Sequence, residues 1–130
     1  MKEKIKKMFN EGVSKISRGD TDKAINSEDA ILKIARKLKG LWEDSKTLIE
    51  MLKAYKNGSY KKIPAALIAA ATFALLYVLS PVDFIPDPVP VVGLTDDAFV
   101  LALVFAGFAS EIKSYRSWRY AQNQSETIEV

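Results

Sequence analysis

Two segments in the N-terminal half repeat apolar residues at the spacing of an amphipathic helix. Residues 2–17 place lysines between them, and Gly19-Asp20 then interrupts the pattern. A longer stripe begins after Ser27, which suits a helix N-cap, and ends at Asn57-Gly58. The apolar positions are Ile5, Met8, Phe9, Val13 and Ile16, followed by Ile31, Ile34, Ala35, Leu38, Leu41, Leu48, Ile49, Leu52 and Tyr55. The pattern predicts amphipathic helices over residues 2–17 and 28–57.

The pattern changes at Ile63, where twenty residues without a charge begin and continue to Val82. A second uncharged run covers Ala98 to Ser110. Apolar residues occupy every side of both runs, which indicates helices that are buried in a core or that cross a membrane. We predict a hairpin of apolar helices at about 63–82 and 95–118. The expected fold class is therefore all-α with four helices.

The distribution of charge divides the chain further. Residues 1–62 hold 16 of the 19 Lys and Arg against 9 acids, whereas residues 63–110 hold four Asp and no base. We therefore expect a basic amphipathic region at 1–62, an apolar hairpin with an acidic proline-rich turn at 63–120, and a polar tail at 121–130. The basic region suits anionic lipid, nucleic acid or solvent.

The composition removes several classes of function. The chain has no Cys and no His, which excludes disulfides, thiol catalysis, the Ser-His-Asp triad and the usual zinc ligands. The charged start at Met1–Lys7 has no apolar stretch behind it, so no cleavable secretory signal is expected and the protein should be made in the cytoplasm. We expect no catalytic residues and a protein that is not an enzyme.

All four acids of residues 63–110 fall in the turn between the apolar runs. Ser80, Pro81 and Thr95 suit the starts of helices, while Pro86 and Gly93 suit a tight turn. The acids would then cap helix N-termini. The alternative is a site for Mg²⁺ or Ca²⁺ built from Asp83, Asp87, Asp96 and Asp97. Because the spacing is not that of an EF-hand loop, capping is the preferred interpretation and no cofactor is expected.

The flanks of the hairpin favour a membrane location. A helix of about twenty residues is about 30 Å long, enough to cross the apolar part of a bilayer. Bases flank its outer ends at Lys61, Lys62, Arg116 and Arg119, which fits a hairpin in the cytoplasmic membrane with both termini in the cytoplasm. Tyr77, Phe84, Tyr115 and Trp118 would form aromatic belts, and the helices would pair through Ala66, Ala70, Ala74, Ala102, Ala106 and Gly107.

A bundle in the cytoplasm is the alternative. The second apolar run is short for a bilayer, and Asp96 and Asp97 would sit at or inside its interface. The two amphipathic helices at 2–17 and 28–57 could instead cover the hairpin in water.

The turn also carries a recognisable motif. The residues are Tyr77-x-Leu79-Ser80-Pro81-x-Asp83-x-Ile85-Pro86-Asp87, followed by Gly93 and Asp96-Asp97. This pattern resembles the YkvA-like family, domain of unknown function 1232, over about residues 63–110. The resemblance implies a small bacterial protein associated with a membrane, and it implies no reaction.

We therefore expect a non-enzymatic, membrane-associated helical hairpin that acts as an interaction or scaffold module. Its expected partners are membrane lipid, a membrane protein or a second copy of the chain. The alternative is a bundle that binds a divalent cation or a protein through the acidic turn. Nucleic acid is not expected, because the lysines of helices 2–17 and 28–57 are interleaved with acids and no binding motif occurs.

Overall fold

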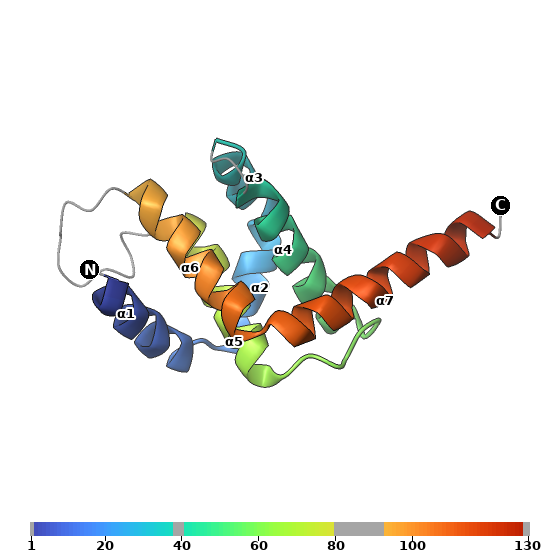
Figure 1. Cartoon of the computed structure of the whole chain (residues 1–130), viewed down its shortest axis with the longest axis horizontal. Coiled ribbons are helices and arrows are strands. Elements are labelled where there is room, and N and C mark those ends of the chain that lie inside the picture. Colours follow the sequence, from blue (N-terminus) through green and yellow to red (C-terminus); the bar gives the residue numbers. More distant parts are fainter. Residues whose placement is uncertain (1, 38–40, 80–92, 129–130) are drawn as a thin grey trace.

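Helix α5 (Ala65–Leu79) is the central element of the computed structural model, and five other helices pack against it (Figure 1). The structure describes residues 2–37, 41–79 and 93–128, with side chains at residues 3, 6–37, 41–79 and 99–123. These residues contain helices and no strand, which confirms the all-α class. The other helices are α1 (Lys2–Ser14), α2 (Arg18–Asn26), α3 (Glu28–Ala35), α4 (Leu41–Asn57), α6 (Gly93–Gly107) and α7 (Ala109–Ile128).

The prediction of four helices was wrong, since the described residues form seven. The first missed helix is α2. The Ser17 hydroxyl accepts a hydrogen bond from the Asp20 amide at 3.4 Å, and the Asp20 carboxylate accepts one from the Ser17 amide at 3.0 Å. This reciprocal capping box satisfies two amides at the start of the helix. Gly19-Asp20, which looked like a break, therefore lies in the first turn of α2.

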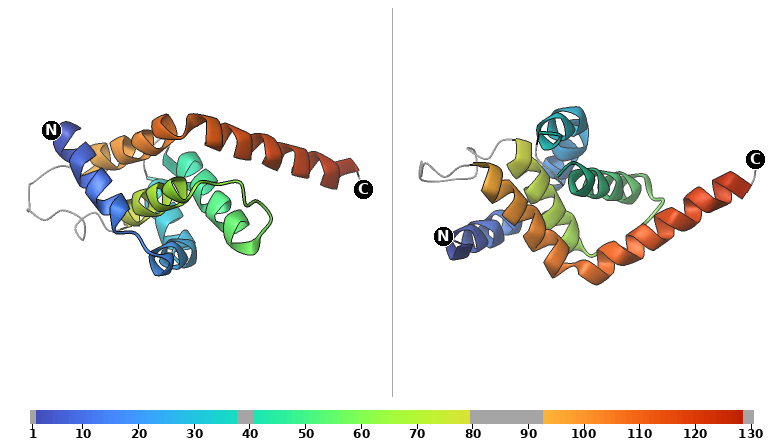
Figure 2. Two further views of the ribbon diagram at one scale, coloured as in Figure 1. Left: turned by 90° about the horizontal axis from the view of Figure 1, so that it is seen from below. Right: turned by 45° about the horizontal axis from the view of Figure 1, so that its top comes forward.

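The other two differences concern helices that were predicted as continuous. The segment 28–57 divides into α3 and α4, on either side of residues 38–40, which lie outside the described residues. The segment 95–118 divides into α6 and α7 at Phe108, where the chain changes direction (Figure 1). Helix α7 then continues to Ile128, beyond the predicted end at Trp118, and its last turns project away from the other helices (Figure 2).

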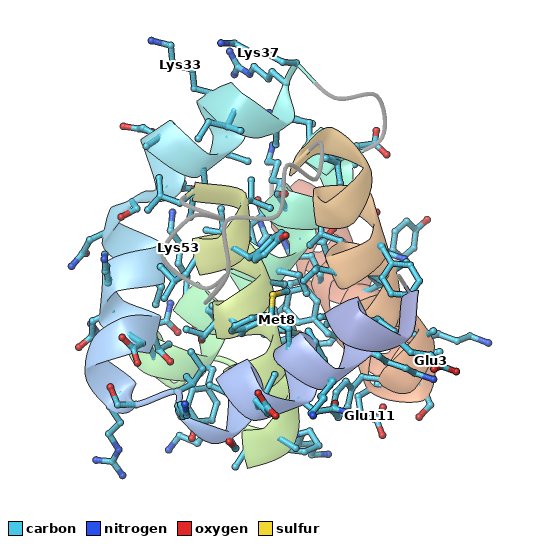
Figure 3. All side chains as sticks on the ribbon, turned by 90° about the vertical axis from the view of Figure 1, so that its left-hand side faces the viewer. Glu3, Met8, Lys33, Lys37, Lys53 and Glu111 are labelled. Carbon is cyan, nitrogen blue, oxygen red and sulfur yellow. The ribbon has the colours of Figure 1, made fainter. Side chains whose placement is uncertain are left out.

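The core forms around α5 because this helix is apolar on all sides. Every residue from Ala70 to Val78 is buried. Phe9 of α1 packs edge-on against Phe73 with 5.6 Å between ring centroids. Met8 points into the interior, while Lys33 of α3 and Lys37 just after this helix project into solvent (Figure 3). Helices α3 and α4 add Ile31, Ala35, Leu41, Leu48, Ile49, Met51 and Leu52. Where the structure describes their side chains, the residues of the amphipathic stripes are buried or partly buried as predicted, apart from Tyr55, which is 41% exposed. Ile5 and Leu38 are not among these side chains.

The predicted membrane-spanning hairpin finds no support among the described residues, where no helix is both long and apolar enough to cross a bilayer. Helix α5 has 15 residues and is about 22 Å long, against about 30 Å for the apolar part of a bilayer. The N-terminal helices α1 to α4 cover it instead. The orientation with both termini in the cytoplasm depended on that span and has no support here either.

The aromatic belts were also predicted incorrectly. Tyr77 and Tyr115 are each 1% exposed, so neither lies at a surface that lipid could reach. Tyr115 and Trp118 of α7 form a cluster with Tyr60, whose ring centroid lies 5.5 Å from that of Tyr115 and 5.0 Å from that of Trp118. These rings fasten α7 to the segment before α5. Phe84 lies outside the described residues.

Candidate functional site

The acidic turn was the principal candidate site, and most of it lies outside the described residues. This applies to Ser80, Pro81, Asp83, Pro86 and Asp87. Helix α6 begins at Gly93, two residues before the predicted start, which places Thr95 and Asp96 in its first turn and Asp97 directly after it. Their side chains are not described. The rest of the chain that the structure describes holds no group of three or more acids suited to a metal ion. The capping and cation-binding roles of the turn therefore stay predictions.

Among the described residues, the strongest candidate for an interaction surface is the outward side of α6. The polar residues of this helix are Thr95, Asp96 and Asp97 near its start, and no polar side chain follows them up to its end at Gly107. It packs on α5, α1, α4 and α7, and no other helix of the described residues covers its remaining side. We call this side the α6 outer face and define it by Phe99, Ala102, Leu103 and Ala106. The two alanines are exposed and the two larger residues are partly exposed.

The α6 outer face corrects the predicted pairing of the hairpin. Helix α6 turns its larger residues Val100, Leu101 and Val104 toward the core, all of them at most 1% exposed. The small residues Ala102, Ala106 and Gly107, which were expected to meet α5, face outward. On α5, Ala70 and Ala74 are buried as expected, whereas Ala66 is exposed.

Cations lie beside this apolar surface. On α7, Lys113 and Arg116 are exposed, and the Arg116 guanidinium lies over the ring of Phe105, 5.4 Å from its centroid. On the other neighbour, α1, Lys6 and Lys7 are exposed. Ring stacking of this kind keeps a guanidinium close to an apolar surface while it stays in contact with water.

The four predicted membrane-flanking bases come together at one end of the hairpin. Lys61 and Lys62 are exposed in the segment before α5, and Tyr60 in the same segment packs against α7, which carries Arg116 and Arg119. Arg119 is partly neutralised, because its guanidinium lies 3.6 Å from the Glu50 carboxylate of α4. This end of the molecule is therefore cationic, as the sequence indicated.

One carboxyl group near these cations has a shifted pKa. Burial raises the pKa of Asp44 on α4 above its ordinary value of 3.8. Arg116 opposes this effect through its positive charge, and the neighbouring Glu43 adds to it. The effect of burial on the pKa of Asp44 is thus larger than the opposing effect of Arg116.

Sequence analysis did not identify the α6 outer face. The signal was present, because residues 98–110 are apolar on all sides although a helix at the surface of a bundle normally has a polar side. The same signal fits a helix buried all round, as α5 is. Only the packing of the other helices distinguishes the two cases.

Comparison with known proteins places the chain in a family. Residues 67–103 match the family described as "Protein of unknown function (DUF1232)", which covers α5, the acidic turn and the first two-thirds of α6. A relative from Bacillus subtilis (strain 168), "Uncharacterized membrane protein YkvA", is 36% identical over 73 residues, 56% of this chain and 69% of the relative. No solved structure matches. Because the alignment spans more than two-thirds of the relative, and the family match at residues 67–103 includes the motif of the turn, the chain belongs to the YkvA-like family of proteins of unknown function, DUF1232.

Proposed function

We propose that the protein is a non-enzymatic module that binds the surface of an anionic membrane through the α6 outer face. The observation that carries the proposal is the uncovered apolar side of Phe99, Ala102, Leu103 and Ala106. Exposed apolar surface of this kind marks an interaction site in a folded domain. The relative that is named a membrane protein supports lipid as the partner.

The charges beside the face favour lipid over a protein partner. Helices that lie in a membrane interface combine an apolar side with Lys and Arg at its margins, and each base near an anionic leaflet contributes about 1 kcal/mol. Lys113 and Arg116 of α7 and Lys6 and Lys7 of α1 have the required exposure. In this arrangement the apolar side of α6 enters the boundary between headgroups and acyl chains, while α5 stays inside the bundle.

Flotation with lipid vesicles tests the proposal. The intact chain should float with vesicles that contain phosphatidylglycerol and should bind more weakly to vesicles of phosphatidylcholine alone. High salt should weaken binding, because it screens the cations. The double variant Ala102→Glu with Ala106→Glu should lose most of the binding, by about tenfold or more, since two charges would have to enter the apolar layer. Both alanines are exposed, so the fold should tolerate the change.

A matched control is Ala30→Glu with Lys33→Gln, which changes the net charge by the same two units at exposed positions of α3. It should leave most of the vesicle binding in place. Equal loss in both variants would indicate only a general effect of charge, and the α6 outer face would no longer be the binding surface. If the α6 variant changed the oligomeric state of the free protein and left vesicle binding intact, the face would belong to an interface between copies of the chain.

A further inference from the structure

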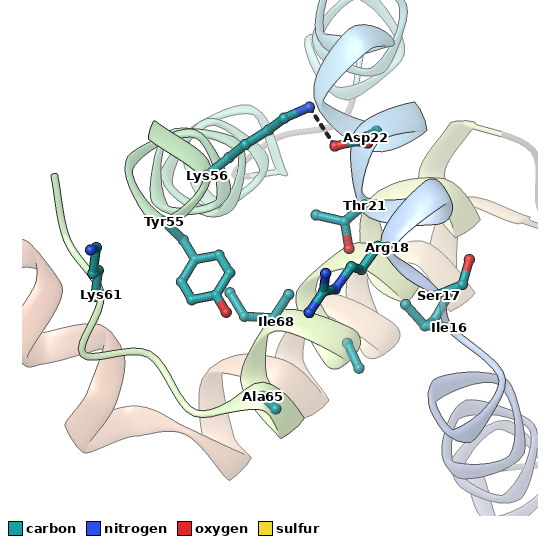
Figure 4. Close-up of a pocket in the computed structure, with 11 residues that line it drawn as sticks. Ile16, Ser17, Arg18, Thr21, Asp22, Tyr55, Lys56, Lys61, Ala65 and Ile68 are labelled. Atoms are coloured by element: carbon teal, nitrogen blue, oxygen red, sulfur yellow. Dashed lines mark hydrogen bonds and ion pairs between the residues drawn. The ribbon is translucent and has the colours of Figure 1, made fainter. Parts of the chain in front are cut away.

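A pocket of about 730 Å³ lies where the start of α2, the end of α4 and the start of α5 meet (Figure 4). Its volume is in the range of sites for small molecules. Helix α5 lies between α2 and α6, so the pocket and the α6 outer face are on different sides of the bundle (Figure 2). The pocket is therefore a separate surface that the proposed membrane contact does not use.

The pocket has an excess of positive charge. Arg18, Lys56 and Lys61 line it together with a single acid, Asp22. The Lys56 ammonium donates to the Asp22 carboxylate at 2.5 Å, which joins α4 to α2 and neutralises both groups (Figure 4). Among the described residues Arg18 and Lys61 have no ion-pair partner. Two uncompensated cations at one pocket favour an anionic ligand.

The backbone at the start of α5 adds to this preference. Ala65 lines the pocket, and the residue before it, Pro64, has no side chain that could cap the helix. The amides of Leu67 and Ile68 donate to the Pro64 carbonyl, at 3.0 and 3.1 Å. The amides of Ala65 and Ala66, which precede them in α5, lack an intrahelical acceptor. The helix dipole is also positive at this end. The start of α2 differs, because Ser17 caps it.

Apart from Ser17 and Thr21, the remaining lining is largely apolar. Ile16, Ile68 and Ala69 contribute aliphatic surface, and the Tyr55 ring, 41% exposed, forms one wall. The Arg18 guanidinium and the Tyr55 hydroxyl both point toward Ile68 (Figure 4). Hydrogen-bond donors and apolar surface thus meet at one place. A ligand that fits both must carry a compact anionic group on a small apolar body.

We propose that this pocket binds a phosphate monoester of a small apolar or aromatic molecule. The phosphate accepts hydrogen bonds from the planar guanidinium of Arg18 and the Tyr55 hydroxyl, near the positive end of α5, while Lys61 at the far edge of the pocket adds positive charge. The organic group lies on Ile68 and Ala69. The side chain of Tyr55 covers it, which explains why a large aromatic residue stays at the surface of this helix.

Titration of the intact chain with phenyl phosphate, followed by NMR or calorimetry, tests the proposal. Phenyl phosphate should bind at least about tenfold more tightly than phenol or inorganic phosphate, because phenol lacks the phosphate and inorganic phosphate lacks the apolar body. Arg18→Gln should weaken binding about tenfold, as should Ala69→Leu, which fills the apolar part of an open pocket. Lys33→Gln removes the same charge at an exposed position of α3, outside the pocket, and should leave the affinity for phenyl phosphate unchanged. No saturable binding of phenyl phosphate, or equal weakening by Arg18→Gln and Lys33→Gln, would overturn the proposal.

A phosphate monoester could be a free metabolite or the headgroup of a lipid. A short-chain phosphatidic acid below its micelle concentration separates these sources. Competition by phenyl phosphate for its binding would assign a lipid headgroup to the pocket, and binding of phenyl phosphate alone would assign a free molecule. The proposed membrane surface on α6 and the proposed phosphate pocket can be tested separately. The Ala102→Glu, Ala106→Glu variant should still bind phenyl phosphate, and Arg18→Gln should float with vesicles as well as Lys33→Gln does.

Discussion

At the scale of single residues, Gly12 of α1 lies directly against the ring of Phe73 in α5. A methyl group added there would lie 2.0 Å from the ring of Phe73, and other ring atoms lie within 2.7 Å. Phe73 is fully buried and is held from the other side by its neighbours in the core. Glycine is thus required at this position by space, since its backbone is ordinary helix.

We expect Gly12→Ala to destabilise the protein by about 1–2 kcal/mol. Alanine improves helix propensity by about 1 kcal/mol, but forcing a buried ring to move costs about 1–3 kcal/mol or more. Denaturation by urea measures the difference. Gly19→Ala in α2 is the control, because its nearest neighbour would be 3.7 Å away and only the propensity gain should appear. Equal stabilisation by both substitutions would mean that α1 does not approach α5 so closely.

The raised pKa of Asp44 gives a prediction for pH. A carboxyl group whose folded pKa lies above its unfolded value of 3.8 binds a proton more readily in the folded protein. Its contribution to stability is therefore fully present below pH 3.8 and is lost as the pH rises through the folded pKa. Relative to Asp44→Asn, the natural chain should lose stability as the pH rises through this window. Melting curves of the two proteins across mildly acidic pH measure the change, and parallel curves would contradict it.

At the scale of helices, one buried hydrogen bond joins α2 to α5. The hydroxyls of Thr21 and Thr72 lie 2.9 Å apart, and Thr72 is fully buried in a helix that otherwise carries only apolar side chains and Tyr77. Because a buried hydroxyl without a partner is costly, the pair fixes how α2 rotates and slides against α5.

We predict that Thr72→Val lowers the free energy of unfolding by about 1 kcal/mol, because it leaves the Thr21 hydroxyl without its partner. Thr21→Val should cost a similar amount or more. The double variant should cost less than the sum, with a coupling energy of about 0.5–1.5 kcal/mol in a double-mutant cycle. Additive effects would indicate that each hydroxyl is satisfied in another way.

Prediction from sequence succeeded for helices whose pattern of apolar and polar residues is contained within one segment of the chain. The apolar stripe of residues 31–52 and the uncharged run that became α5 were both identified from periodicity. Helix α2 was missed although its signal was local, because Gly19 was given more weight than the Ser17 and Asp20 capping box. The change of direction at Phe108 is different. It depends on how α7 meets Tyr60, 48 positions earlier than Phe108, and spacing within one segment does not contain this contact.

At the scale of the whole molecule, the central question is what surrounds α5. A helix that is apolar on all sides fits a protein core and a bilayer equally well, so its own sequence cannot choose between them. The choice depends on whether α1 to α4 have apolar sides of the right shape to cover it, and residues such as Phe9, Ile31 and Leu48 provide these. The candidate site was less predictable still, since the α6 outer face is defined only by the absence of a covering helix.

Hydrogen exchange tests this arrangement directly. If α1 to α4 cover α5, its amides from Ala70 to Val78 should exchange most slowly in the chain, in buffer without lipid or detergent, and at a rate set by global unfolding. The exposed turns of α7 around Tyr120 should exchange quickly, because they project from the bundle. Phe9→Ala should speed exchange throughout α5, since removing a buried ring costs about 3–5 kcal/mol. Rapid exchange of α5 that slows only when vesicles are added would show that the bilayer, and not the N-terminal helices, protects it.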